Sequence, residues 1–417
     1  MRNAIRAVAV SLSLVFVGST AMGAGFALYE FSARGNAMGG AVMANKAEAA
    51  SLAVNPALIT QIEGSQVQAG ATFVIPNATA TIGAAGDTTR SLESRVFTLP
   101  NVYATYQASE NVFLGLAGFS RFGLGGSYPD YKTWNGAGIA YKFDLVTFSV
   151  TPVIAAKVTD DLSLSMGLEF MYVNFEESKW IAATDGTNVD VGGDGTGWGG
   201  NFGAYYKPEW APKWGFGVAY RTKMRHIVDG TLKTTGVQIA GVTPPSDDVR
   251  GSVTLPDAFN FGVSYAPVEE LVLEAGMIAT FWSSFDAIRI EYKNLPVPTI
   301  AEKKNYKDAY RFNLGAEYAL NNNWDIRGGY AFDMTPTNSD YMDTLVPVGD
   351  RHLFNAGFGY KRDNWGIDMA YTYLLGMRMS GTYNGAGGTP VKYTDGDTHM
   401  IGLTFKYSFG QHFLRSK

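Results

Sequence analysis

The connections between strand-like runs constrain this chain more than any other feature. Between residues 63 and 409 we recognise about fourteen short runs with strand character, and the connections between them alternate in length. The short connections are residues 107–111, 159–161, 207–213, 266–270, 321–323 and 361–364, and the long ones are residues 84–93, 123–144, 176–196, 223–248, 286–305, 334–349 and 380–390. Up-and-down barrels of bacterial outer membranes have tight periplasmic turns and long outer loops. We therefore predict an all-β fold, a transmembrane antiparallel β-barrel of about 14 strands spanning residues 63–409.

Hydrophobic residues alternate with small or polar residues along these runs. In the last run Ile401, Leu403 and Phe405 alternate with Gly402 and Thr404. Side chains alternate between the two faces of a strand, so one face of this run is apolar and the other is small or polar. Such faces also occur in soluble sandwiches, which do not account for the sorted connections or for the N-terminus.

The first 23 residues have the pattern of a secretory signal peptide. Arg2 and Arg6 precede a short apolar stretch at residues 7–17, and small residues stand before a predicted cleavage site in front of Ala24. No later stretch reaches about 18 consecutive apolar residues, which argues against helical membrane spans. A closed barrel is the other structure that satisfies its backbone hydrogen bonds in lipid. We therefore expect a location in the bacterial outer membrane.

Composition argues against several other functions. The net charge is −5 with no basic tract, so we expect no nucleic-acid partner. Cysteine is absent, and the four histidines have no zinc-site spacing, so we expect no metal and no cofactor. The sequence contains no nucleophile elbow and no phosphate-binding loop, and we predict that the protein is not an enzyme.

Residues 24–62 lack the strand pattern. Residues 36–52 are rich in Ala and Gly with apolar residues at helix-like spacing, and Asn55, Pro56 and Ala57 follow. Proline removes a backbone donor and fixes φ, so this tripeptide should end a helix or set a turn. A barrel of about fourteen strands leaves a wide lumen. We predict that residues 24–62 form a hatch that plugs it, the alternative being a disordered periplasmic tail.

Two stretches resemble a known family. The first comprises residues 24–32 (AGFALYEFS) with residues 55–60 (NPALIT), and the second begins KDAYR at residues 307–311. Both are similar to the FadL/TodX (OMPP1) family of outer-membrane transporters of long-chain fatty acids and other hydrophobic compounds. The resemblance implies a 14-stranded barrel with an N-terminal hatch, working as a monomer, that binds its substrate in an apolar lumen pocket. It also implies lateral release of the substrate through a gap at a kinked third strand.

The substrate and the partners follow from this resemblance as expectations. Long-chain fatty acids are the first candidate, and aromatic or alkane hydrocarbons are the alternative by the same route. A general aqueous porin, a barrel lipase and an adhesin remain further alternatives. We expect contacts with outer-membrane lipid and lipopolysaccharide, and insertion by the barrel-assembly machinery. The C-terminal extension at residues 410–417, beyond the terminal aromatic Phe409, departs from the usual end of such barrels.

Candidate site residues divide into three groups. A carboxylate is best matched by a fixed cation, which nominates basic side chains near the lumen, with one adjacent aromatic residue; each cation could instead be a solvated loop charge or part of a lumen ion pair. These candidates are Lys179, Trp180, Lys303, Lys304 and Arg311. The third strand, predicted at residues 112–122, should bend near Gly118, Gly123 and Gly125, because glycine inside a strand often marks a bulge or bend. For the hatch we select Phe26, Asn55, Pro56 and Ala57, and expect Asn55 to hydrogen-bond the kinked strand.

Overall fold

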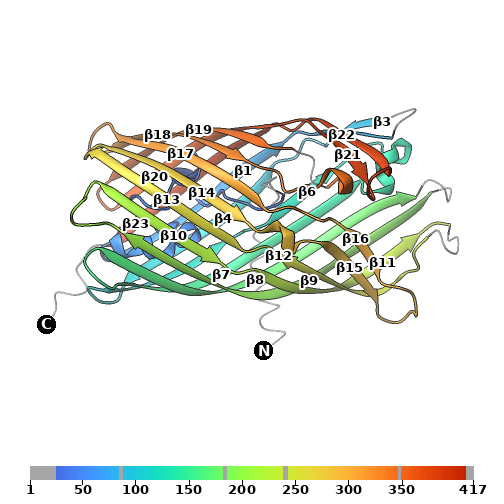
Figure 1. The fold of residues 1–417 in the computed structure, drawn as a ribbon, viewed down its shortest axis with the longest axis horizontal. Coiled ribbons are helices and arrows are strands. Elements are labelled where there is room, and N and C mark those ends of the chain that lie inside the picture. Colours follow the sequence, from blue (N-terminus) through green and yellow to red (C-terminus); the bar gives the residue numbers. More distant parts are fainter. Residues whose placement is uncertain (1–24, 84–87, 182–185, 238–242, 346–348, 410–417) are drawn as a thin grey trace.

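A computed structural model of the chain describes residues 25–83, 88–181, 186–237, 243–345 and 349–409. These residues form a closed antiparallel barrel of 14 strands, in which β1 pairs with β4 on one side and with β23 on the other (Figure 1). The signal peptide and the C-terminal extension predicted from the sequence lie outside the described residues.

Several wall strands are interrupted and carry two labels. In order around the wall they are β1 (Ser65–Pro76), β4 (Phe97–Gln107), β5 (Val112–Phe119) with β6 (Gly123–Ser127), β7 (Lys142–Lys157), β8 (Leu162–Ile181), β9 (Thr187–Tyr206), β10 (Trp214–Arg221) with β11 (Met224–Thr235), β12 (Asp247–Leu255) with β13 (Ala258–Val268), β14 (Leu271–Thr280) with β15 (Ala287–Tyr292), β16 (Ile300–Lys303) with β17 (Ala309–Ala319), β18 (Trp324–Asp333), β19 (Arg351–Arg362), β20 (Trp365–Gly376) and β23 (Thr398–Phe409).

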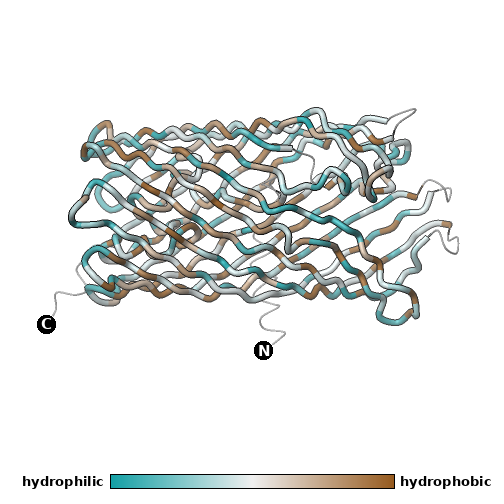
Figure 2. Tube along the Cα trace, viewed as in Figure 1, coloured by the Kyte–Doolittle hydropathy of each residue, from teal (hydrophilic) through white to brown (hydrophobic). Residues whose placement is uncertain are grey.

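The apolar faces of these strands point outward. On β20, Ile367 is 43% exposed, whereas the neighbouring Asp368 is 1% exposed and faces the lumen. The last strand repeats the pattern, with Leu403 and Phe405 exposed and Thr404 buried. Hydrophobic and hydrophilic residues accordingly alternate along the strands in Figure 2. Apolar side chains outside and polar side chains inside are typical of a barrel in lipid, so the predicted fold class is confirmed.

The two ends of the barrel differ as the sequence predicted, with one correction. All the predicted short connections join adjacent wall strands at one end. The predicted long connection at residues 176–196 is mostly strand, because β8 and β9 stay paired from Leu162 and Tyr206 as far as Ile181 and Thr187. At the same end a separate four-stranded sheet forms from β2 (Thr79–Ile82), β3 (Thr88–Ser91), β21 (Met379–Tyr383) and β22 (Thr389–Asp395) (Figure 1). Single 3-10 turns complete the connections: η2 (Tyr131–Thr133), η3 (Asn135–Gly138), η5 (Trp282–Ser284) and η6 (Ser339–Tyr341).

The hatch lies inside the lumen, drawn in blue in Figure 1. Its regular elements are α2 (Ala33–Ala37), α3 (Ser51–Val54) and η1 (Pro56–Gln61). The helix-like spacing at residues 36–52 does not form one helix, because only residues 36–37 and 51–52 of that stretch are helical. The predicted break is confirmed, since α3 ends at Val54 and Pro56 opens η1. None of the described helices is long and apolar enough to cross a membrane.

Polar contacts and glycines seat the hatch against the wall. Arg34 Nε lies 2.7 Å from Glu317 Oε2, and the backbone N–H of Met43 donates to Glu274 over 2.5 Å. A Cβ added at Gly217 of β10 would overlap the carbonyl oxygen of Met43. Close approach of two backbones is a recurring reason for glycine within a strand.

Candidate functional site

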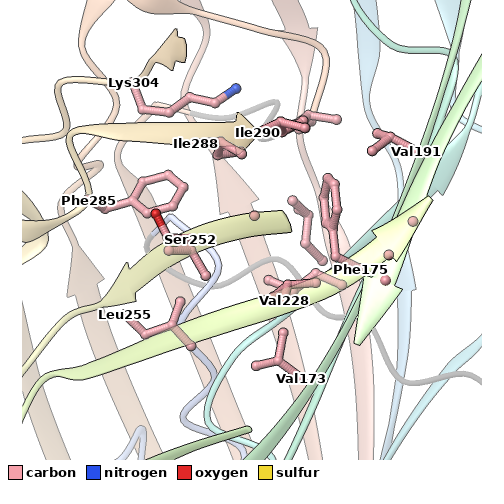
Figure 3. Close-up of a pocket in the computed structure, with 18 of the residues that line it drawn as sticks. Val173, Phe175, Val191, Val228, Ser252, Leu255, Phe285, Ile288, Ile290 and Lys304 are labelled. Carbon is pink, nitrogen blue, oxygen red and sulfur yellow. The ribbon is translucent and has the colours of Figure 1, made fainter. Parts of the chain in front are cut away.

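An apolar pocket lies on the outer side of the hatch. Inward-facing residues of β8, β9, β11, β12 and β15 enclose a narrow cavity of about 90 Å³, with the mostly apolar lining that is typical of small-molecule sites. Figure 3 labels Val173, Phe175, Val191, Val228, Leu255, Phe285, Ile288 and Ile290 around this space. A lining of this kind suits an apolar molecule, because burying each CH₂ group contributes about 0.8 kcal/mol.

A groove leads from the outer end of the barrel to this pocket. It is formed by the outer parts of β8, β9 and β11 together with residues of the connection between β15 and β16, including Val297 and Pro298. The pocket and the groove share Phe175, Val191 and Ile288. A hydrophobic ligand would therefore meet a continuous apolar surface between the outer end and the lumen.

A chain of ion pairs borders both spaces. Lys179 Nζ lies 2.9 Å from Glu177 Oε1 and 3.1 Å from Glu302 Oε2, in the groove. Lys304 Nζ lies 2.6 Å from Glu302 Oε1 and 2.6 Å from Asp343 Oδ2, at the pocket. Burial alone would lower the pKa of Lys304, but the carboxylates of Asp343 and Glu302 outweigh burial and hold that pKa well above its ordinary value. Lys304 is therefore a buried, charged group with its charge already matched.

Aromatic residues close the inner end of the pocket. The ring of Phe26, from the hatch, lies 4.6 Å from the ring of Trp282 and 6.0 Å from that of Phe122, measured between centroids. Phe285 packs against the same cluster, with its ring centroid 5.2 Å from that of Phe26. The predicted hatch residue Phe26 thus lies where the hatch meets the pocket.

The wall is open next to this cluster. The ladder between β4 and β5 runs only from the Gln107–Phe113 pair to the Val102–Gly118 pair. Beyond it β6 pairs with β7, and no described ladder joins β6 to the rest of β4. The predicted single strand at residues 112–122 thus breaks after Phe119, between Gly118 and Gly123, while Gly125 lies inside the regular β6 ladder.

The hatch takes the place of the missing neighbour at this break. Ala27 forms a bridge with Phe122, the N–H of Leu28 donates to the carbonyl of Arg121 over 2.7 Å, and the N–H of Gly123 donates to Phe26. Arg121 also lies 3.2 Å from Glu169 Oε2. The break is therefore held by contacts that a movement of the hatch would remove.

The Asn55-Pro56-Ala57 motif joins the hatch to a different part of the wall. The Asn55 side chain donates to the carbonyls of Met43 (2.9 Å) and Ala204 (3.0 Å) and accepts from the N–H of Ala57. Ala204 belongs to β9, so the predicted partner, the kinked third strand, was wrong. Residues 51–61 pack against both β5 and β9, with Leu52 lying against Gly115 of β5, and no sequence pattern decides which of the two strands Asn55 reaches.

The remaining candidate residues lie apart from the pocket. Arg311 stacks its guanidinium 4.6 Å from the ring centroid of Tyr29 in the hatch and faces Asp333 at 3.9 Å. Lys303 is exposed on β16, and Trp180 packs edge-on against Tyr131. The sequence prediction missed the apolar lining and the acidic partners Glu302 and Asp343.

The fold and the lumen define the class of the protein. A closed antiparallel barrel with an apolar outer face, a plugged lumen and an apolar inner pocket is an outer-membrane protein that handles hydrophobic molecules. The chain belongs to the outer membrane protein transport protein family (OMPP1/FadL/TodX), whose model matches residues 14–409.

Individual relatives agree with this assignment over nearly the whole chain. The long-chain fatty acid transport protein of Escherichia coli O6:H1 is 24% identical, with 96% of this chain and 98% of the relative covered. Outer membrane protein P1 of Haemophilus influenzae is 23% identical over the same shares. Among solved structures, a Pseudomonas aeruginosa FadL homologue superimposes with a TM-score of 0.81 (18% identity; 92% and 100% covered). The toluene transporter TodX of P. putida superimposes with 0.73 (17% identity; 92% and 100% covered).

Proposed function

We propose that this protein takes up hydrophobic compounds through the outer membrane by lateral release. The substrate enters along the outer groove, binds in the apolar pocket, and leaves between β4 and β6 once the hatch segment at Phe26 moves. The observation that carries this proposal is the position of the pocket, whose aromatic floor includes Phe26 and abuts the break in the third strand. Lateral exit keeps an apolar molecule out of water, where each exposed CH₂ group would cost about 0.8 kcal/mol.

Two substrate classes fit this route. Long-chain fatty acids are proposed first, because the Escherichia coli relative described above is named as a long-chain fatty acid transport protein. Hydrocarbons are the second candidate, favoured by a specific observation: the lysines that border the pocket are already paired with carboxylates. The hatch fills the inner lumen and argues against a general aqueous pore.

The proposal is tested by binding and uptake together. Purified protein in detergent is titrated with oleate, toluene and hexadecane, and cells that lack other hydrophobic-uptake barrels are assayed with and without the protein. We expect saturable binding of at least one ligand and faster uptake of that ligand. A protein that binds none of them, or that conducts ions as an open pore in planar bilayers, would refute the proposal.

A further inference from the structure

In the ion-pair chain between groove and pocket each lysine is paired with two carboxylates, and Lys179 keeps 23% of its side chain exposed. Lys304 is 2% exposed, and its ammonium group contacts both Glu302 and Asp343. Lys179 contacts Glu177 and shares Glu302. Each ammonium group therefore has two carboxylate partners, at N–O distances between 2.6 and 3.1 Å, as in charge-assisted hydrogen bonds.

The same chain carries more acid than base. Three carboxylates (Glu177, Glu302, Asp343) face two ammonium groups, which gives a net charge of −1 when all five are ionised. Among the described residues that line the pocket, Lys304 is the only cation. A ligand carboxylate would therefore meet a surplus of negative charge around Lys304.

Displacing one of the acids is also unfavourable. The second oxygen of the Asp343 carboxylate accepts the backbone N–H of Leu345 at 2.8 Å, which fixes the side chain in place. Asp343 is itself buried, so a ligand carboxylate that took its place on Lys304 would leave a buried charge without its cation. Removing one partner of a buried ion pair is strongly destabilising.

We propose that Glu302 and Asp343 make this site selective for uncharged hydrophobic molecules, either hydrocarbons or long-chain compounds with a neutral polar head. The two acids act as specificity determinants by saturating the lysines that would otherwise bind a carboxylate. The groove and the pocket share this chain, so a ligand passes it on the way in. This inference rests on the proposed uptake function and names the substrate class within it.

A pair of ligands that differ only in the head group tests the selectivity. Purified full-length protein in detergent is titrated at pH 8 with dodecanol and with dodecanoate, first as wild type and then as Asp343→Asn and Glu302→Gln. We expect wild type to bind dodecanol about tenfold more tightly or better. Each substitution should raise the affinity for dodecanoate relative to dodecanol by roughly 10–100-fold, the value of one hydrogen bond to a charged group.

The control variant and the opposing outcomes separate this inference from the proposed function. Asp340→Asn removes an exposed carboxylate from the connection that also carries Asp343. This control should leave the ratio of dodecanol affinity to dodecanoate affinity unchanged. Wild type that binds dodecanoate as tightly as dodecanol overturns the selectivity and leaves the uptake function intact. The selectivity is also overturned if Asp343→Asn and Glu302→Gln both keep the wild-type ratio of dodecanol affinity to dodecanoate affinity. Folded wild type that binds neither ligand contradicts the uptake function itself.

Discussion

The outer and inner halves of the lumen are built on different principles. The outer half is a space with apolar walls, lined by residues such as Val173 and Phe175, and its charged groups are paired with one another. The inner half is filled by the hatch. Buried polar contacts, such as that of Arg34 with Glu317, attach the hatch to the wall. Apolar area can bind a molecule without fixing its position, whereas directional polar contacts fix a segment in one position.

Residues 26–28 connect the two halves. Phe26 lines the inner end of the pocket, and residues 26–28 together bridge the broken third strand. This segment is short, and it is attached to the break by a few backbone hydrogen bonds and by the contact of Phe26 with Phe122. Residues 26–28 must therefore move if a ligand in the outer half is to reach the gap between β4 and β6.

The largest effect should come from preventing that movement. The natural sequence has no cysteine, so Ala27→Cys combined with Phe122→Cys adds one disulfide at bridge-paired positions. We expect oxidised protein to lose nearly all uptake of its ligand, and reduction to restore it. The measurement is initial uptake by cells before and after addition of reductant. The two single-cysteine variants are the controls, and Phe122→Cys alone shows the effect of the lost phenylalanine ring. Unchanged uptake by fully oxidised protein would mean that the exit route lies elsewhere.

A second substitution tests the apolar half alone. Phe175→Ala should weaken binding of a hydrophobic ligand by roughly 10–100-fold, because burying a phenylalanine side chain is worth about 1.5–3 kcal/mol. The matched control is Phe358→Ala, which removes an outward-facing ring that is 42% exposed. Equilibrium titration of both purified variants gives the comparison. Equal losses for the two would show that the pocket does not hold the ligand.

A third substitution tests the seat of the hatch. Gly217→Ala forces the wall against the Met43 carbonyl and should destabilise the folded protein by ~1–3 kcal/mol, in the range of overpacked cores. Hydrogen exchange of the hatch amides should rise with it. Gly328→Ala is the control, because a Cβ there would come no nearer than 3.9 Å to its closest neighbour. Identical hydrogen exchange of the hatch amides in Gly217→Ala and Gly328→Ala would show that the hatch does not pack closely against the wall at Gly217.

The smallest effect is expected at Arg311. Its guanidinium lies over Tyr29 of the hatch rather than in the pocket. Arg311→Met should therefore change ligand affinity by less than about threefold while lowering stability by ~0.5–2 kcal/mol, the scale of a cation–π contact. Titration and thermal unfolding of one preparation measure both quantities. A large loss of fatty-acid affinity at unchanged stability would return Arg311 to the substrate-binding group.

The sequence predicted the features that depend on local pattern. The alternation in residues 401–405 and the six short connections fixed the barrel and its even strand number, and the Asn55-Pro56-Ala57 motif marked a break in the hatch. The continuation of β8 and β9 to Ile181 and Thr187 escaped prediction, because cross-strand pairing rather than apolar alternation maintains these strands.

The site was less predictable for a related reason. Lys179 and Lys304 were recognisable as basic residues near the lumen, but the fold brings them their shared partner Glu302 and, for Lys304, also Asp343. The partner of Asn55 was missed likewise, since β9 and the third strand both pass the hatch. Contacts between segments far apart in the chain decide whether a cation is available to a ligand.

The most direct test of the account is a structure of the protein with a brominated hydrocarbon. Crystals soaked in 1-bromododecane, measured at the bromine absorption edge, locate the ligand without any assumption about its path. We expect an anomalous peak among Val173, Phe175 and Val228, which line the pocket together with Phe26. Peaks confined to the lipid-facing surface, with none inside the barrel, would contradict it.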